Sequence, residues 1–117
     1  MDQVIRITKE FSFEMSHVLS DYDGPCRNVH GHSYKLFVTV AGIPLKEAGN
    51  PKHGMVMDFT DMKRIVVNEI VGVFDHAAAI PDDLDSHKTE AFRKMFGNVI
   101  VVDYQPTCEN LVTDFAG

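Results

Sequence analysis

The sequence predicts an α+β fold, which two kinds of hydrophobic periodicity indicate. Apolar residues recur at every second position near the N-terminus and again over 30–40, a period that is typical of β-strands. They recur at helical spacing over about 59–73 and about 86–96, and a further helix is predicted to begin near 107. No internal repeat or low-complexity segment divides the chain, so residues 1–117 are expected to form a single domain.

The first strand is expected to run from about Ile5 to His17. Its odd-numbered positions carry most of its apolar side chains, namely Ile5, Ile7, Phe11, Phe13 and Met15. The even-numbered positions between them are polar, as in an antiparallel strand with one buried face. A loop rich in Asp, Gly, Pro and Asn is expected from Val18 to about Val29.

The second strand is expected to run from His30 to Val40. Its even-numbered positions are predicted to face the core with the side chains of Tyr34, Leu36, Val38 and Val40. Residues 42–54 contain three glycines and two prolines, which is typical of a connection rather than of an element.

Two helices are expected in the middle of the chain. The first covers about 59–73 with Asp58 as its N-cap. Its apolar residues lie at helical spacing and are Phe59, Met62, Ile65, Val66, Ile70 and Val73. The second covers about 86–96 and is capped by Asp85 or Ser86.

The last predicted elements are a short strand and a short helix. Val99–Val102 is a continuous apolar run and is predicted to be a strand. Thr107 follows a proline and is predicted to cap a helix, of which about two to three turns precede Gly117. Much of that helix's apolar face would then lack a partner, so the domain is expected to be incomplete at its C-terminus.

Composition excludes several functional classes. Eleven Lys and Arg residues against 17 Asp and Glu residues give a net charge of −6, which argues against a general binder of nucleic acid or of anionic membranes. A local cationic pocket for a phosphorylated substrate is still compatible with that balance. Two cysteines are too few for a disulfide scaffold. No apolar run is long enough to span a membrane and no secretory signal is visible, so a soluble, cytoplasmic protein is expected.

Three histidines are expected to meet at one end of the predicted hairpin. His30 and His32 are two positions apart at the start of one strand, so their side chains project from the same face. His17 lies at the end of the preceding strand, on its apolar face. Three imidazoles suit Zn²⁺, and a set without a fourth protein ligand is typical of an open, catalytic site. Alternatively, they are core histidines that are merely hydrogen-bonded.

Two further sites carry candidate acid–base groups. Cys26 lies in the loop before the second strand and has three interpretations: a proton-transfer base, a fourth zinc ligand, or a buried small side chain. Asp75 precedes His76 and could orient its imidazole in a proton relay. Alternatively, His76 only interacts with the C-terminal dipole of the first helix. His53 and His87 are interpreted as solvated.

Five short motifs occur along the chain in a characteristic order. They are Phe13-Glu14-Met15-Ser16-His17, Cys26-Arg27-Asn28-Val29-His30-Gly31-His32, Gly54-Met55-Val56-Met57-Asp58-Phe59, Asp75-His76 and Pro106-Thr107-Cys108-Glu109-Asn110-Leu111. Together they resemble the 6-pyruvoyl-tetrahydropterin synthase / 6-carboxy-tetrahydropterin synthase family over nearly all of residues 4–117. The resemblance implies the tunnelling fold, an antiparallel four-stranded sheet with helices packed on one face. It also implies a homo-hexamer, built as a dimer of trimers.

The resemblance implies residue roles in three sets. Zinc would be bound by His17, His30 and His32. A proton relay would consist of Cys26, Asp75 and His76, in active sites that lie between subunits. The pterin end of the pocket would contain Thr107 and Glu109.

The spacing Cys-x-x-x-His-Gly-His resembles the bacterial 6-carboxy branch, which serves queuosine biosynthesis. That branch implies a zinc-dependent carbon–carbon lyase that converts 7,8-dihydroneopterin triphosphate to 6-carboxy-5,6,7,8-tetrahydropterin, acetaldehyde and triphosphate. The alternatives are a 6-pyruvoyl-tetrahydropterin synthase that eliminates triphosphate, an aldolase or epimerase relative, and a non-catalytic zinc-binding module. The family's two closing strands have no counterpart before Gly117, so the last strands of the sheet are expected to be missing.

Overall fold

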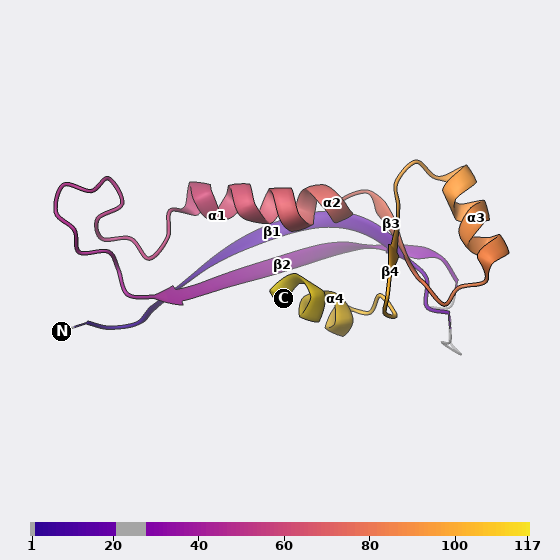
Figure 1. Ribbon diagram of the computed structural model, residues 1–117, viewed down its shortest axis with the longest axis horizontal. Coiled ribbons are helices and arrows are strands. Elements are labelled where there is room, and N and C mark those ends of the chain that lie inside the picture. The colour runs from indigo at the N-terminus through magenta and orange to yellow at the C-terminus, as the bar shows by residue number, and fades with distance from the viewer. Residues whose placement is uncertain (1, 21–27) are drawn as a thin grey trace. The chain divides into compact units, whose positions relative to one another are not determined.

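The computed structural model describes residues 2–20 and 28–117. In chain order its elements are β1 (Ile5–His17), β2 (His30–Gly42), α1 (Phe59–Val66), the π-helical turn η2 (Val67–Val71), α2 (Gly72–Phe74), β3 (Ala77–Pro81), α3 (Ser86–Met95), β4 (Val99–Val102) and α4 (Cys108–Ala116) (Figure 1). The predicted α+β class is confirmed. Within the described ranges, no helix combines the length and the apolar character that crossing a bilayer requires.

Four strands form one sheet in the order β2-β1-β3-β4. The long strands β1 and β2 run in opposite directions, because Thr8 pairs with Thr39 while Glu14, farther along β1, pairs with the earlier Ser33 of β2. The Thr8 and Thr39 hydroxyls are 2.8 Å apart, and the Ser33 hydroxyl donates to the Glu14 carboxylate at 2.6 Å. This half of the sheet is antiparallel, as predicted.

The other half of the sheet is parallel, so the prediction of a purely antiparallel sheet is wrong. In β3, Ala77 lies beside Met15 of β1, and Ala78 lies beside Val99 of β4, with all three strands running the same way. The physical reason is the connection between β3 and β4. It contains the helix α3, which allows the chain to cross over and return in the same direction.

β3 itself has no counterpart among the predicted strands. All five of its residues are buried, so the strand has no polar face and shows no alternation. Its run of alanines also has a high intrinsic helix propensity. Unlike the β-branched run of β4, this alanine run therefore does not indicate a strand.

The described residues divide into two compact units. The first contains the described residues up to Ser12 together with Lys35–Gly72. Its core consists of Phe11, Met62 and Val66, against which pack Ile7, Leu36, Val38, Val40, Met57, Ile70 and Val71. The helix therefore covers the odd-numbered side chains of β1 and the even-numbered ones of β2, as the alternation predicts.

The predicted helix over 59–73 is confirmed with an irregularity. Asp58 caps it by accepting the Thr60 N–H at 2.8 Å. At η2 the helix widens into a π turn, which the sequence does not predict. Gly72 allows this turn, because a Cβ at that position would lie only 2.7 Å from the Val67 carbonyl oxygen.

The second unit contains the described residues of Phe13–Tyr34 together with Val73–Gly117. In it, the Phe13 ring stacks on Tyr34 with the ring centroids 5.0 Å apart. Phe115 of α4 contacts the edge of Phe13 and of Phe74, at 6.3 and 5.1 Å between centroids. This aromatic cluster holds α4 against β1, beside the end of the strand that carries His17.

Candidate metal centre

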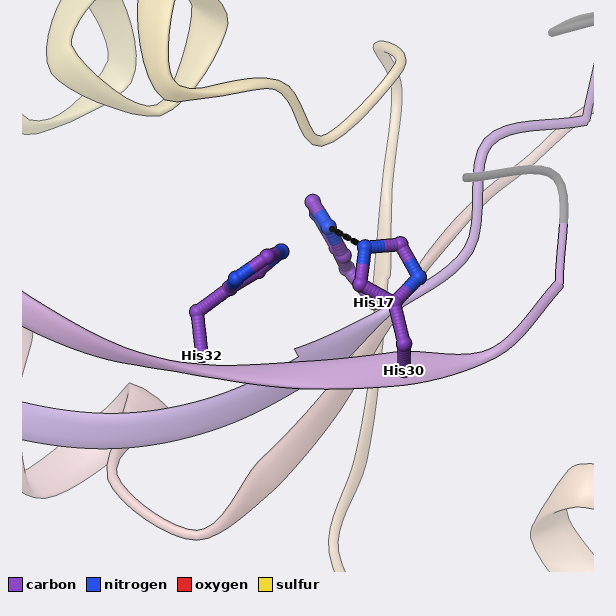
Figure 2. Close-up of side chains that lie close together, drawn as sticks. All are labelled: His17, His30 and His32. Atoms are coloured by element: carbon purple, nitrogen blue, oxygen red, sulfur yellow. Dashed lines mark hydrogen bonds between the residues drawn. The ribbon is translucent and has the colours of Figure 1, made fainter. Parts of the chain in front are cut away.

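Three histidine side chains converge at one end of the hairpin (Figure 2). His17 comes from the last position of β1, whereas His30 and His32 rise from the same face of β2. One nitrogen of each ring lies within 4.8 Å of the others, so the three could hold a metal ion. The ring centroids are 4.6 to 5.0 Å apart and the ring planes are steeply inclined to one another, by 68 to 88°. The predicted convergence of the three imidazoles is observed.

Main-chain carbonyls orient two of these rings. The Nδ1–H of His17 donates to the Pro106 carbonyl oxygen at 2.7 Å, and that of His30 donates to the Asn28 carbonyl oxygen at 2.8 Å. A carbonyl only accepts, so the hydrogen must lie on Nδ1 in both rings. In the neutral form, each Nε2 is then left with a free lone pair, which is the state that binds a metal.

The two free Nε2 atoms of His17 and His30 lie 3.0 Å apart. Two lone pairs at this distance repel each other unless a positive charge lies between them, either a second proton on one ring or a metal ion. Two nitrogens bound to a tetrahedral zinc ion would be separated by about 3.3 Å, close to the observed distance. His32 is exposed and lies on the open side of the cluster. The donor set and spacing therefore fit zinc.

Burial favours the metal over the extra proton at His17. The side chain is only 6% exposed, and this burial lowers the pKa of His17 below its ordinary value of 6.5. The Pro106 hydrogen bond partly opposes the shift, while the neighbouring His30 and His32 add to it. The lowered pKa favours the neutral form of His17.

Tyr34 forms the apolar side of the cluster and was not singled out as a functional residue by its sequence pattern. Its ring lies nearly perpendicular to His32 and His17, at 5.8 and 6.5 Å between centroids. Its hydroxyl is buried and has no hydrogen-bond partner among the described residues. Burial raises the pKa of Tyr34 to about 12, so the ring presents a neutral phenol to the site.

Asp75 and His76 form an acid–base pair that is hydrogen-bonded to the main chain of β1. The Asp75 carboxylate lies 3.1 Å from His76 Nδ1 and accepts the Glu14 N–H at 2.9 Å, a bond that lowers the pKa of Asp75. The His76 N–H donates back to the Glu14 carbonyl oxygen at 2.6 Å. His76 adopts a left-handed backbone with φ of 61°, which is uncommon for a residue other than glycine.

The Asp75–His76 pair does not belong to the histidine cluster of the same chain. His76 is 79% exposed and lines an open hollow whose other lining residues include Glu14, Ser16, Ser33 and the cluster residue His32. The side chains of Glu14, Ser16 and Ser33 alternate with those of the metal-site residues along β1 and β2, so they project from the opposite face of the sheet. His76 lies beside Glu14, one position before the pairing of Ala77 with Met15.

The remaining predicted site residues have different outcomes. Cys26 lies outside the residues that the structure describes. Thr107 is the N-cap of α4, and its side chain accepts the Asn110 N–H at 3.2 Å. Glu109 is exposed in the first turn of the same helix. A role for Thr107 and Glu109 in binding a pterin stays a prediction.

Sequence reasoning missed the groups that orient the imidazoles. They are the main-chain carbonyls of Pro106 and Asn28, and a main-chain carbonyl leaves no signal in the residue type. The position of Pro106 at the head of the fifth motif is the one available hint.

Comparison with known proteins identifies the family of this chain. The family model described as 6-pyruvoyl tetrahydropterin synthase matches residues 6–117. The chain is 36% identical to the 6-carboxy-5,6,7,8-tetrahydropterin synthase of Haemophilus influenzae over 92% of this chain and 77% of that protein. It is 44% identical to the protein of the same name from Synechocystis sp. over 60% of this chain and 54% of that protein.

A crystal structure has the same fold. An uncharacterized protein from Wolinella succinogenes superposes with a TM-score of 0.68 at 22% identity, covering 95% of this chain and 80% of that one. Because the family model spans nearly the whole sequence, the chain belongs to the 6-pyruvoyl tetrahydropterin synthase family.

Proposed function

We propose that this chain is a zinc-dependent 6-carboxy-5,6,7,8-tetrahydropterin synthase, a carbon–carbon lyase acting on 7,8-dihydroneopterin triphosphate. The facing Nε2 atoms of His17 and His30, 3.0 Å apart, carry the proposal of a metal centre. The names of the Haemophilus influenzae and Synechocystis relatives support the choice of reaction.

His17, His30 and His32 would hold the zinc ion. When bound, zinc supplies Lewis-acid chemistry that lowers the pKa of hydroxyl groups, such as those of the substrate side chain. The protein's part would be to present three imidazoles and to leave the exposed side, at His32, open to the substrate.

Asp75 and His76 would move a proton, together with Cys26 as thiolate. Asp75 holds the Nδ1 of His76 at 3.1 Å, so Nε2 of the exposed imidazole is free to exchange a proton with a substrate. Since the pair lies on the opposite face of the sheet from its own histidine cluster, we infer that it serves the metal centre of a neighbouring subunit. This supports an oligomer with active sites between subunits.

The proposed reaction balances without an external reductant. One water molecule is consumed, the bond between the first and second side-chain carbons breaks, and acetaldehyde and triphosphate leave. The pterin ring gains two hydrogens while the first side-chain carbon is oxidised to a carboxyl group. The protein therefore has to manage protons only, which matches a site made of imidazoles, a carboxylate and a thiol.

Incubating the zinc-loaded protein with 7,8-dihydroneopterin triphosphate and identifying the products by mass tests this proposal. We expect 6-carboxy-5,6,7,8-tetrahydropterin together with acetaldehyde, and loss of both in His32→Ala. His87→Ala, which changes an exposed histidine in α3, is the matched control and should remain active. Release of triphosphate without acetaldehyde would instead indicate a 6-pyruvoyl-tetrahydropterin synthase. Zinc binding without turnover would indicate a non-catalytic zinc module.

A further inference from the structure

We propose that Gln105 is a positioning residue of the metal centre, because it holds the Pro106 carbonyl in place against His17. This inference deepens the proposed function and rests on the metal site described there. Gln105 immediately precedes Pro106 in the segment between β4 and α4. The hydrogen bonds of its side chain within the described residues go to Ser20 and Asp83, so its effect on His17 would pass through the Pro106 carbonyl.

Both the oxygen and the nitrogen of the Gln105 side-chain amide form hydrogen bonds. Its Oε1 accepts the Ser20 N–H at 2.9 Å, and its Nε2 donates to the Ser20 hydroxyl oxygen at 2.7 Å. Ser20 follows His17 by three residues, at the exit of β1. The segment that precedes α4 is therefore tied directly to the segment that carries the first predicted ligand.

A carboxylate completes this arrangement, which we call the Gln105 clamp (Ser20, Asp83 and Gln105). Asp83, in the turn after β3, accepts the Ser20 hydroxyl at 2.7 Å and the Gln105 amide at 3.1 Å. Asp83 is exposed, whereas Ser20 and Gln105 are half-buried. Three segments far apart in the sequence thus meet at one amide group.

Hydrogen bonds to the main chain also fix the segment that follows Gln105. The Gln105 carbonyl oxygen accepts the Thr107 N–H at 2.7 Å and the Asn110 side-chain amide at 3.0 Å. The Pro106 side chain is less than 2% exposed, and its ring restricts the backbone φ angle. Between these two held flanks, the Pro106 carbonyl oxygen accepts the His17 Nδ1–H at 2.7 Å.

This direction matters for metal binding because it selects the tautomer of His17. A hydrogen bond to the Pro106 carbonyl keeps the hydrogen on Nδ1 and leaves Nε2 free as a ligand atom. If the clamp is released, the segment gains freedom and the preference for this tautomer weakens. A role in stability alone would lower the melting temperature without changing the tautomer.

The test uses the full chain with Gln105→Ala and measures the tautomer and the metal affinity separately. In the metal-free protein at about pH 8, nitrogen-15 chemical shifts of the imidazoles report which ring nitrogen carries the hydrogen. We expect Nδ1–H at His17 in the parent and a mixture of tautomers in Gln105→Ala. Competition with a chromophoric chelator should show zinc affinity reduced about tenfold, the lower end for an outer-sphere partner.

Asp83→Ala is the second variant and should shift both readouts in the same direction, even if Gln105→Ala fails to fold. Asp82→Ala is its matched control, since it removes the same charge from the neighbouring exposed position and should change neither readout. An unchanged His17 tautomer and zinc affinity in the folded clamp variants would overturn the inference. If the parent binds no zinc, the proposed function fails, while the tautomer comparison still decides on the clamp.

Discussion

At the scale of single residues, a neutral imidazole has one hydrogen to donate, so the partner of one ring nitrogen decides what the other can do. In His17 and His30 a main-chain carbonyl accepts that hydrogen, at 2.7 and 2.8 Å. Both Nε2 atoms are left as acceptors that face each other. The geometry is unfavourable for an empty pair of neutral rings and favourable for a pair that shares a cation.

The lowered pKa of His17 predicts how the metal-free protein responds to acid. Between the folded pKa and the ordinary value of 6.5, the unfolded chain binds a proton that the folded chain does not. The free energy of unfolding should therefore fall as the pH drops through this window. Urea denaturation from about pH 7.5 to about pH 5.5 measures it. His17→Gln should show a shallower dependence on pH, and an equally steep one would contradict the assignment.

Because His76 adopts a left-handed backbone, substitutions at this position can distinguish the role of its imidazole from the role of its backbone conformation. Asparagine tolerates positive φ, so His76→Asn should keep the melting temperature close to that of the parent. Without an imidazole to transfer protons, kcat should fall by about 10²–10⁴-fold. His76→Val, which disfavours positive φ, should lose stability as well as turnover. Full activity in His76→Asn would exclude His76 from the relay.

The meeting of the three histidines could be predicted from residue parity, because His17, His30 and His32 lie on the apolar positions of two strands that were expected to pair. The carbonyls of Asn28 and Pro106 could not, since any residue type carries one. Neither could the location of Asp75 and His76 on the opposite face, which depends on main-chain hydrogen bonds to Glu14.

At the scale of elements, the geometry of the π turn η2 predicts that substitution of Gly72 lowers the stability of the fold. A Cβ at Gly72 would lie 2.7 Å from the Val67 carbonyl oxygen, closer than such contacts allow. Gly72→Ala should therefore destabilise the fold by about 1–3 kcal/mol, because the turn has to shift to admit the methyl group. Chemical denaturation measures the loss.

Gly97→Ala is the control for that prediction. A Cβ there meets no heavy atom of the described residues within 4 Å, so the free energy of unfolding should change by less than about 0.5 kcal/mol. Equal effects of the two substitutions would show that the π turn does not constrain Gly72.

The helices and the two long strands could be predicted from the sequence because each has one apolar and one polar face. The predicted caps Asp58 and Thr107 are also observed. β3 could not be predicted, because its residues show no alternation and its alanines favour a helix over a strand. Since the sequence did not predict β3, it also could not predict the parallel pairings of β3 with β1 and β4. The family resemblance implied an antiparallel sheet instead.

At the scale of the whole molecule, the opposite locations of the histidine cluster and of Asp75–His76 predict complementation between subunits. His32→Ala and His76→Ala should each be inactive alone. Mixed oligomers, formed by co-expression, should regain activity because some sites combine an intact cluster from one subunit with an intact His76 from its neighbour. Random mixing in equal amounts gives about one quarter of the sites intact. Oligomers that contain both variants and stay inactive would contradict a shared site.

The central claim is that His17, His30 and His32 form an open metal centre, and zinc-edge X-ray absorption of the zinc-loaded protein tests it most directly. We predict one zinc ion per chain with three imidazole nitrogens at about 2.0–2.1 Å and a further oxygen neighbour. His53→Ala should leave the spectrum unchanged, whereas His32→Ala should remove one imidazole. A sulfur neighbour at about 2.3 Å would contradict the claim, because it would indicate a closed site with a cysteine ligand.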